Sequence, residues 1–541
     1  MVKMREKSNK NLILMICIFF IFSCQSFLIS ATETEPVNYT INTENILYVG
    51  GNGPGNYTRI QEAIDSASEN DTIFVYQGIY YETVSISKKL NIQGESKDKT
   101  IINGQYKEDT DILFISASDV TINNFTIKCS ENVGKGIEIN DCNHTIISNC
   151  NFNNHTSEAI GCIRSSNNWI FNCKIENCTI GIRLNRNSNN NTISNCMINT
   201  NRTAIGISSS NNIVTNCVLN EKLLISWGSN SSIINCAFSN DDIGRHAIQM
   251  EYTTNNTLRN NSFDHCGFIF HCNFLEQLYH NIDTTNTING KPIYYLIQEK
   301  DYVINENNEI GFIGLISCQN ITIMNQELHG GIIGDSNHCI IDNCSFIENT
   351  RGIAIDLSSN NMVTNCYFSN ANPIRIFKSS NNIINNCSIP QGHPYGIGIE
   401  IDYYSSNNSI IGCQIAQFWD GIVSTGYSSR NTIRECDIHD NLVGISLSGN
   451  DNRLDKCNIF NNGLGFSIGG DYNYIIANNF FNNTKNAEAY GHNTWNEEKK
   501  GNFWDDWIGI KVPFLRFIPY FIKGTLFSNI DWHPSIDLNI E

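Results

Sequence analysis

Asn149-Cys150-Asn151-Phe152 returns along the chain as Asn172-Cys173-Lys174-Ile175 and again as Asn195-Cys196-Met197-Ile198. The Asn-Cys pair recurs, with looser cysteine-only copies near the end, at Asn216-Cys217, Asn235-Cys236, Asn343-Cys344, Asn365-Cys366, Asn386-Cys387, Cys413, Cys436 and Cys457. Successive cysteines are mostly 19 to 23 residues apart. That spacing is typical of one coil of a β-solenoid and is too short for a repeat built from two helices.

Two further rows keep step with the cysteines. One is an apolar pair after asparagine, as in Asn168-Trp169-Ile170 and Asn382-Ile383-Ile384. The other is a Gly-Ile pair, found at Gly136-Ile137, Gly181-Ile182, Gly352-Ile353, Gly396-Ile397 and Gly444-Ile445. Each row alternates apolar with polar residues between Asn, Ser or Gly, which predicts short strands with one buried face. Three rows per repeat predict an all-β fold, a right-handed parallel β-helix with three strands per coil.

The cysteine row has two interpretations. A metal site needs several ligands that converge on one point, whereas a solenoid row presents one sulfur per coil along a line. We therefore expect a buried interior row of mostly free thiols. Disulfides between neighbouring coils stay open as an alternative, because coils about 4.8 Å apart lie within disulfide range.

The chain begins with features of an export signal. Four basic residues precede the apolar stretch 12–29, and Ser30-Ala31 offers a cleavage position. The alternatives are an uncleaved membrane anchor or lipid attachment at Cys24, so any membrane contact is expected only through this segment. The sequence thus predicts a secreted, periplasmic or cell-surface protein. Because 35 Lys and Arg oppose 53 Asp and Glu, the net charge of -18 argues against nucleic-acid binding.

Both open ends of a parallel β-helix need covers, because unpaired strand edges bind other chains. Residues 58–68 place Ile60, Ala63 and Ile64 on one face, which predicts a short helix that caps the first coil. The predicted segments are a signal peptide (1–31), a linker (32–45), the N-terminal cap and first coils (46–104), β-helix repeats (105–273), an insertion (274–315), further repeats (316–485) and a C-terminal cap (486–541).

Three motifs carry a resemblance to a known family. They are Tyr48-Val49-Gly50 with the following 57–64 and 78–86 segments, Asn289-Gly290-Lys291-Pro292-Ile293-Tyr294-Tyr295, and Gly501-Asn502-Phe503-Trp504. Together they resemble the pectin-lyase-like β-helix proteins of the NosD type, which carry the carbohydrate-binding and sugar-hydrolysis (CASH) repeat. The resemblance covers nearly all of the chain after the signal. It implies a β-helix that handles carbohydrate, and the family name implies copper.

One stretch combines aromatic residues with carboxylates. The 26-residue interval between Cys387 and Cys413, with the coil after it, holds His393, Tyr395, Asp402, Tyr403, Tyr404, Trp419 and Asp420. Aromatic faces stack on the apolar faces of sugars, and carboxylates accept hydrogen bonds from hydroxyl groups. We expect these residues to bind carbohydrate if they share one face. Ordinary solvated turn residues are the simpler alternative.

Catalytic and metal sites are weaker expectations. Aligning the Gly-Ile rows places Asp356 and Glu400 at equivalent positions two coils apart, or about 10 Å, slightly beyond the spacing of glycosidase carboxylates. His265, His271 and Cys272, with Cys266, form the one tight His and Cys group, and methionines are isolated, so no metal or other cofactor is expected.

The sequence favours an exported β-helix that binds carbohydrate or another surface partner, such as a polysaccharide or cell-surface glycan, along its lateral face. Two alternatives remain: a polysaccharide lyase or glycoside hydrolase on the same scaffold, and a purely structural surface protein. Catalysis stays undecided, because no complete catalytic constellation is present in the sequence.

Overall fold

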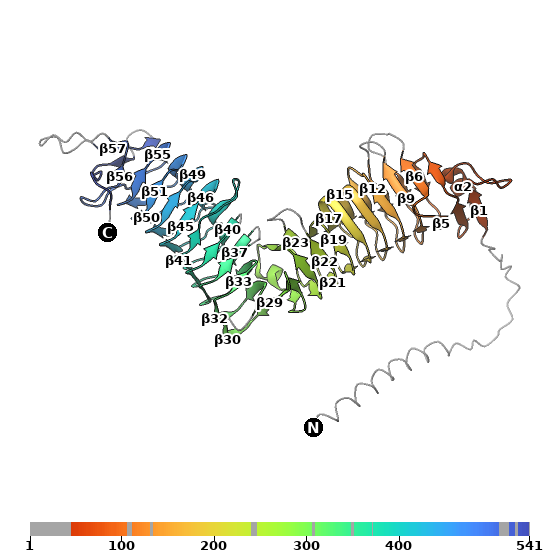
Figure 1. The fold of residues 1–541 in the computed structure, drawn as a ribbon, viewed down its shortest axis with the longest axis horizontal. Helices are drawn as coiled ribbons and strands as arrows, with labels where there is room; N and C mark the ends of the chain where they lie inside the picture. The colour runs from red at the N-terminus through yellow and green to blue at the C-terminus, as the bar shows by residue number, and fades with distance from the viewer. Residues whose placement is uncertain are drawn as a thin grey trace, which may run out of the picture. The chain divides into compact units, whose positions relative to one another are not determined.

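The computed structural model describes residues 45–104, 111–129, 134–239, 246–305, 309–347, 351–369, 372–507, 519–524 and 529–539. These residues form one compact unit, a right-handed parallel β-helix (Figure 1). The predicted signal peptide and nearly all of the predicted linker lie outside the described residues. No helix in the described ranges is long and apolar enough to cross a membrane.

One coil contributes three short strands. In the second half of the chain, β37 (Arg351–Asp356), β38 (Met362–Thr364) and β39 (Tyr367–Phe368) make one coil. The next coil repeats them as β40 (Asn372–Phe377), β41 (Ile383–Asn385) and β42 (Ser388–Ile389), each parallel to its counterpart. The predicted three-stranded coil is confirmed. In the first half, two of the three faces merge where long strands run through the corner, in β15 (Lys174–Leu184) and β17 (Met197–Ile207).

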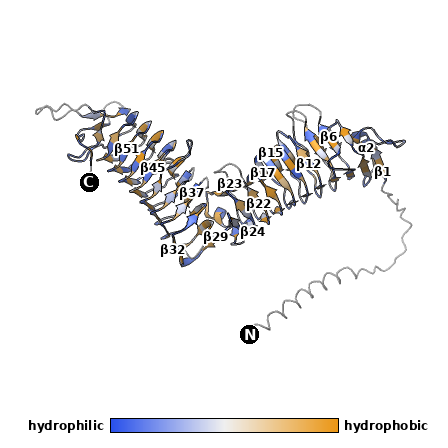
Figure 2. Cartoon of the chain, in the orientation of Figure 1, coloured by the Kyte–Doolittle hydropathy of each residue, from blue (hydrophilic) through white to orange (hydrophobic). Residues whose placement is uncertain are grey.

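The predicted cysteine row lies inside the solenoid. Asn151 pairs with Lys174, and Lys174 with Met197, so the preceding Cys150, Cys173 and Cys196 occupy one file. All three are at most 2% exposed. Isoleucines fill the other interior rows, and Figure 2 shows hydrophobic and hydrophilic residues interleaved along the strands of the stack. Stability therefore comes from continuous burial between neighbouring coils.

The cysteine row does not continue to Cys266. Ala237 pairs with Ser262, so the residue stacked on Cys236 is Asn261, whose Oδ1 accepts a hydrogen bond from the Cys236 backbone N–H at 2.9 Å. The coil that begins at Cys236 thus reaches the same position at Asn261, five residues before the next cysteine, Cys266. A buried asparagine fits the row because its amide also donates to the Ile233 carbonyl at 2.9 Å.

Buried asparagines form a second interior ladder, at the corner where the sequence predicts them. The Asn361 side chain donates to Asn382 Oδ1 at 3.1 Å, and Asn382 donates to Asn408 Oδ1 at 3.1 Å. Asn431 and Asn452 continue the row. Each amide thereby satisfies its own donor and a neighbouring acceptor, which locks the register of adjacent coils.

The Gly-Ile row has a different register from the one expected at residue 396. Ile353 pairs with Ile374, and Ile374 with Ile399, so Gly398-Ile399 belongs to the row and Gly396-Ile397 does not. Position 398 requires glycine, because a Cβ there would lie 2.5 Å from the Gly421 carbonyl oxygen. Asp356 is therefore equivalent to Asp402 across Phe377, and the predicted equivalence of Asp356 with Glu400 was wrong by two residues.

Both ends of the solenoid carry covers. The helix α2 (Ile60–Ser66) buries Ile60, Ala63 and Ile64, and the Glu82 carboxylate accepts hydrogen bonds from the Ile60 and Gln61 backbone N–H groups at its start. At the other end, Trp504 in β56 (Phe503–Trp504) stacks on Phe480 with ring centroids 4.4 Å apart. Its Nε1 donates to Asp531 at 3.0 Å.

The segment 274–315 contributes strands to the stack. It holds the short 3-10 helix η1 (Leu275–Leu278), then β27 (Asn281–Ile282) and β28 (Thr287–Ile288), which extend the first half. A turn at Asn289-Gly290 makes an antiparallel hairpin between β28 and β29 (Lys291–Ile297). β29 pairs with β31 (Phe312–Ile316), and β30 (Lys300–Ile304) with β32 (Gln319–Met324), which begins the second half.

The thiol state of the ladder is directly measurable. All nineteen cysteines among the described residues are free and buried. We expect no reaction of these thiols with an iodoacetamide reagent in the folded protein, and alkylation of all nineteen after unfolding without reductant, counted by intact mass. Cysteines that react only after reduction would show disulfides between coils.

The C-terminal cap should be a large contributor to stability. Trp504→Ala removes a fully buried ring and the Asp531 hydrogen bond, so the free energy of unfolding should fall by about 3–5 kcal/mol. Urea unfolding followed by circular dichroism measures it. Trp532→Ala, at a tryptophan that is 57% exposed, is the control and should change stability little. Equal effects would contradict a specific role for the cap.

Candidate functional site

The candidate carbohydrate-binding residues border the outer face of one sheet. They lie on or beside β43 (Ile397–Asp402) and β46 (Asp420–Ser424), and β43 pairs with β46 on one side and with β40 on the other. Ile399 and Ile401 are fully buried, so the alternate residues Glu400 and Asp402 face outward. The site therefore has a strand floor with carboxylates, and its aromatic residues lie at the two strand ends.

The first aromatic group, at the strand starts, consists of His393, Tyr395 and Trp419. Tyr395 and Trp419 are 77% and 45% exposed, and their rings stack with centroids 5.8 Å apart. His393 is 5.7 Å from Tyr395, and its Nδ1 accepts a hydrogen bond from the Tyr395 backbone N–H. Asp420 follows Trp419, and burial raises the pKa of its carboxyl. The structure thus brings these four predicted residues together.

The second aromatic group, at the strand ends, consists of Tyr403, Tyr404 and Tyr427. Tyr404 and Tyr427 are 65% and 76% exposed and stack with ring centroids 5.6 Å apart. Tyr403 packs on Phe377 at 5.3 Å. Sequence reasoning missed Tyr427, although it lies one coil after Tyr404 and its spacing of 23 residues could have revealed it. Two exposed stacked pairs therefore flank the same two strands.

Asp402 anchors the second group. Its carboxylate accepts hydrogen bonds from the Tyr403 backbone N–H at 2.8 Å and from the Thr425 hydroxyl. Beside it, Lys378 lies 5.3 Å from the Phe377 ring and 5.8 Å from each of the Tyr403 and Phe274 rings. Cation–π contacts of this kind hold a lysine over aromatic faces. The Asp402 oxygens thus position the tyrosine turn.

Asp356 is buried, although it points away from the solenoid interior. Its side chain is 0% exposed, and Arg375 donates to it from Nη2 at 2.7 Å and from Nε at 3.3 Å. Cys272 Sγ lies 3.5 Å from the same carboxylate, and burial, followed by the charge of Asp356, raises the pKa of that thiol. A carboxylate held this way is part of a buried ion pair and has no free access to a sugar chain.

The weak metal candidates are spread along one strand. His265 and Cys272 lie just beyond opposite ends of β26 (Gly267–His271), and His265 pairs with exposed Asp264 at 3.6 Å. Seven residues of extended chain separate the two by roughly 20 Å. Across the described ranges, no three His, Cys, Asp or Glu side chains gather in a way that could hold a metal ion.

Two family models match the chain. "Right handed beta helix region" matches residues 110–223 and 302–417, and "Periplasmic copper-binding protein (NosD)" matches residues 403–509, which include the second aromatic group and the cap tryptophans. The chain belongs to the NosD-type parallel β-helix family. The resemblance carried by its sequence motifs is thereby confirmed. In this NosD-type chain the described side chains do not fit copper, because no group of three or more His, Cys, Asp or Glu side chains among them could hold a metal ion and the cysteines are buried.

Relatives outside these models are distant. A probable pectinesterase 56 from Arabidopsis thaliana is 29% identical over 92 residues, which are 15% of this chain and 32% of that protein. The NosD-type chain thus spans about a third of that relative. Among solved structures, pectin methylesterase PemA from Erwinia chrysanthemi has 15% identity, covers 42% of this chain and 81% of its own, and gives a TM-score of 0.28. The catalytic domain of a GH87 α-1,3-glucanase in complex with nigerose has 12% identity, covers 66% of this chain and 67% of its own, and gives a TM-score of 0.34.

A substitution tests whether Asp356 is structural. Asp356→Asn leaves the Arg375 guanidinium buried without its countercharge, so the free energy of unfolding should fall by roughly 3–5 kcal/mol. The double variant Asp356→Leu with Arg375→Met removes both charges and should recover most of the loss. Glu400→Gln, on the partly exposed floor, is the control. If Asp356→Asn unfolded in denaturant like the control, the ion pair would have no structural role.

Proposed function

We propose that this protein binds a polymeric carbohydrate along the outer face of β40, β43 and β46, between the two aromatic groups. The observation that carries the proposal is the pair of exposed ring stacks, Tyr395 with Trp419 and Tyr404 with Tyr427, at opposite ends of the same strands. Exposed aromatic rings cost free energy in water, and sugar rings are the ligands that cover such faces while leaving their edges wet.

The outward residues of β43 between the two aromatic groups also support carbohydrate binding. Glu400 and Asp402 face outward there, and carboxylates accept hydrogen bonds from sugar hydroxyl groups. The two stacks are separated by the length of β43, roughly 20 Å, which suits an extended polymer better than a single sugar. A solenoid presents such long flat faces as binding surfaces.

Binding fits the geometry better than hydrolysis does. Of the two carboxylates first considered as a catalytic pair, Asp356 is occupied by Arg375 and lies in a different register row from Glu400. Hydrolysis of a glycosidic bond needs two accessible carboxylates about 5–9.5 Å apart, one of them protonated. The polymer would be met outside the cell, since the NosD family description is periplasmic and the N-terminal segment has the composition of an export signal.

The aromatic groups should dominate the affinity. Replacing Tyr395 and Trp419 by alanine, or Tyr404 and Tyr427, removes two stacking rings at about 0.5–1.5 kcal/mol each, which is roughly a tenfold loss of affinity. Affinity electrophoresis against a panel of soluble neutral and acidic polysaccharides measures it. The same incubations are assayed for new reducing ends and unsaturated products, which would indicate an enzyme instead.

The matched control is the ring pair Trp227 and Tyr252, whose ring centroids are 4.7 Å apart on the other half of the solenoid. Their alanine variants should bind every polysaccharide as the unaltered protein does. Retarded migration that is unchanged in both aromatic-group variants, or no retardation by any polymer in the unaltered protein, would overturn the proposal.

A further inference from the structure

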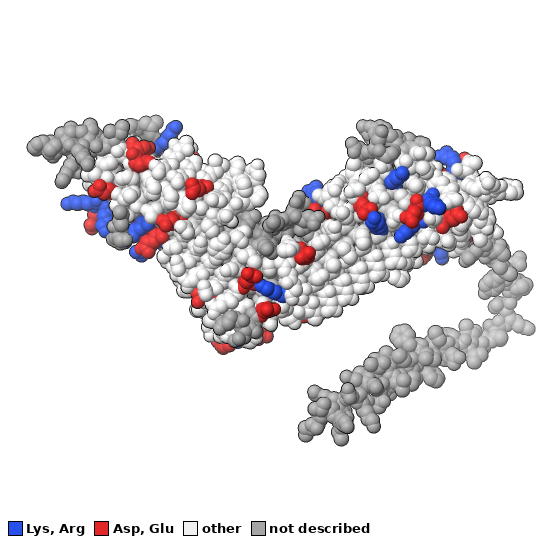
Figure 3. All heavy atoms as spheres, in the orientation of Figure 1, with Lys and Arg blue, Asp and Glu red and all other residues white. Residues whose placement is uncertain are grey.

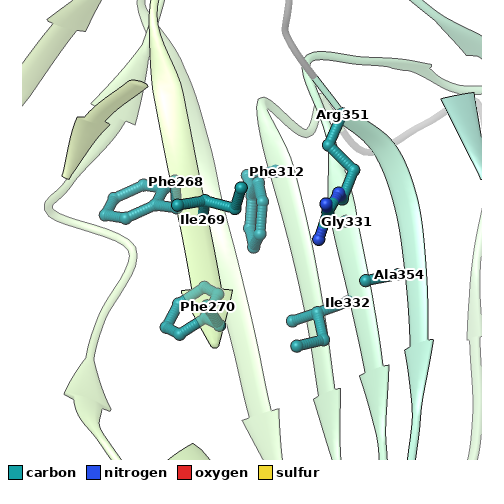
Figure 4. Close-up of a pocket in the computed structure, with 8 residues that line it drawn as sticks. All are labelled: Phe268, Ile269, Phe270, Phe312, Gly331, Ile332, Arg351 and Ala354. Atoms are coloured by element: carbon teal, nitrogen blue, oxygen red, sulfur yellow. The ribbon is translucent and has the colours of Figure 1, made fainter. Parts of the chain in front are cut away.

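A small recess lies on the outer face of the second half, two coils before the first aromatic group. Its walls are Phe268, Ile269 and Phe270 of β26 on one side and Phe312, Gly331, Ile332 and Ala354 of successive strands on the other, with Arg351 at the edge. Figure 4 shows the Arg351 side chain reaching inward from the start of β37, between Phe312 and Ala354. The recess encloses about 250 Å³, including its solvent-open mouth.

Among the residues that the structure describes, Arg351 is the one polar side chain that lines this recess. Its Nε and Nη1 atoms are buried, and no described residue accepts a hydrogen bond from them. No carboxylate in the described part of the chain forms an ion pair with it either. The nearby Asp356 carboxylate is already held by both donors of Arg375. An uncompensated guanidinium among aromatic side chains is costly, so this group is prepared for a negative ligand.

Arg351 supplies the positive charge of the recess. Burial, and after it the charge of Arg375, lowers the pKa of Arg351 to about 10. Burial, and after it the charge of Arg351, lowers the pKa of His246 to about 3 and that of His271 to about 4, so both imidazoles are neutral at pH 7. His246 Nδ1 is also buried without a hydrogen-bond partner among the described residues. The two histidines therefore add no charge beside Arg351.

The recess lies in line with the first aromatic group. Arg351 pairs in register with Asn372 of the next coil, and Asn372 Oδ1 accepts a hydrogen bond from the Ile397 backbone N–H at 3.1 Å. Ile397 in turn pairs with Asp420, beside Trp419. Two coils, or about 10 Å along the stack, therefore separate the guanidinium from the aromatic rings. A polymer lying on these rings can reach the mouth of the recess.

We propose that Arg351 binds a carboxylate of the polymer, so that the ligand is an acidic, uronate-containing polysaccharide. This inference rests on the proposed carbohydrate binding and adds the class of sugar. The planar fork of a guanidinium matches the two oxygens of a carboxylate. The aromatic walls exclude water around the pair, which strengthens it. The recess is too small for a sugar ring, so only a group of a few atoms can contact Arg351 while the ring stays outside, on the side of the first aromatic group.

The overall charge of -18 does not prevent this, because charged side chains are sparse over much of the solenoid surface. In the view of Figure 3, most of the surface between the two ends carries neither sign. On the outer face near the recess, Lys378 adds a second positive charge, Arg375 is paired with Asp356, and Glu400 lies in register with Arg375 one coil further. A bound polyanion therefore meets positive charge at Arg351 and Lys378, and repulsion from distant exposed charges is screened within about 10 Å at 0.1 M salt.

The test compares two matched polymers, oligogalacturonate and the same oligomer with its carboxylates reduced to alcohols, by isothermal titration calorimetry. The unaltered protein should bind the acidic oligomer at least tenfold more tightly. Arg351→Met should abolish that preference while leaving affinity for the reduced oligomer unchanged, and Arg351→Lys should keep only part of it. Arg202→Met, at an exposed arginine on β17, is the matched loss of charge and should keep the full preference.

A measurement on the unaltered protein covers the case in which Arg351 variants do not fold. Free galacturonate should compete with the acidic oligomer, and galactose should not. Equal affinity for the two oligomers, or an acid preference that survives in Arg351→Met, would overturn the carboxylate site while leaving carbohydrate binding intact. If the unaltered protein bound neither oligomer and no member of the polysaccharide panel, the proposed function itself would fail.

Discussion

The structure depends on one backbone constraint, the left-handed residue that begins each turn before the cysteine row. Asn149, Asn172 and Asn195 have φ angles of 50°, 54° and 53°. Asparagine tolerates this conformation because its short amide bonds locally. Because every coil turns by the same amount at the same place, equivalent side chains fall on top of one another. Glu435, Lys456 and Ala477 hold φ of 55°, 56° and 57° at the same position, so the stack imposes the turn even on residues that disfavour it.

This constraint explains how much of the fold was readable from sequence. The row positions repeat one residue type, so Cys150, Cys173 and Cys196 were placed in one interior file and their burial is confirmed. The repeat could not be followed in the sequence where the row changes residue type. Asn261 takes the place of a cysteine next to Cys236, because what the position requires is size and a hydrogen bond to the previous coil, which asparagine also provides. Overlapping Gly-Ile pairs at 396–399 caused the other error, since only the closest backbone approach distinguishes them.

In the candidate site, too, some residues were predictable from the sequence and others were not. The aromatic residues were predictable because they directly precede or follow a strand, and local sequence decides which side chains lie at a strand end. The buried groups were not predictable. Cys272 and Asp356 touch across 84 residues, and no repeat pattern encodes the covering of β31, β34 (Gly331–Gly334) and β37 by β26. Outward positions on those strands look like solvent positions in the sequence, although Asp356 is fully buried.

Because β26 covers some coils and not others, carboxylates on neighbouring coils are buried in one case and solvated in the other. Asp356, under the cover, needs Arg375 to remain ionised at low cost, whereas Glu400 faces outward one coil beyond Arg375 and is partly solvated. Arg351 lies under the cover without a described carboxylate partner. The outer face thus passes within a few coils from a dry, positive recess to exposed aromatic stacks. Because coils advance in fixed steps of about 4.8 Å, these elements sit at set intervals that a polymer of repeating units can match and a single sugar cannot.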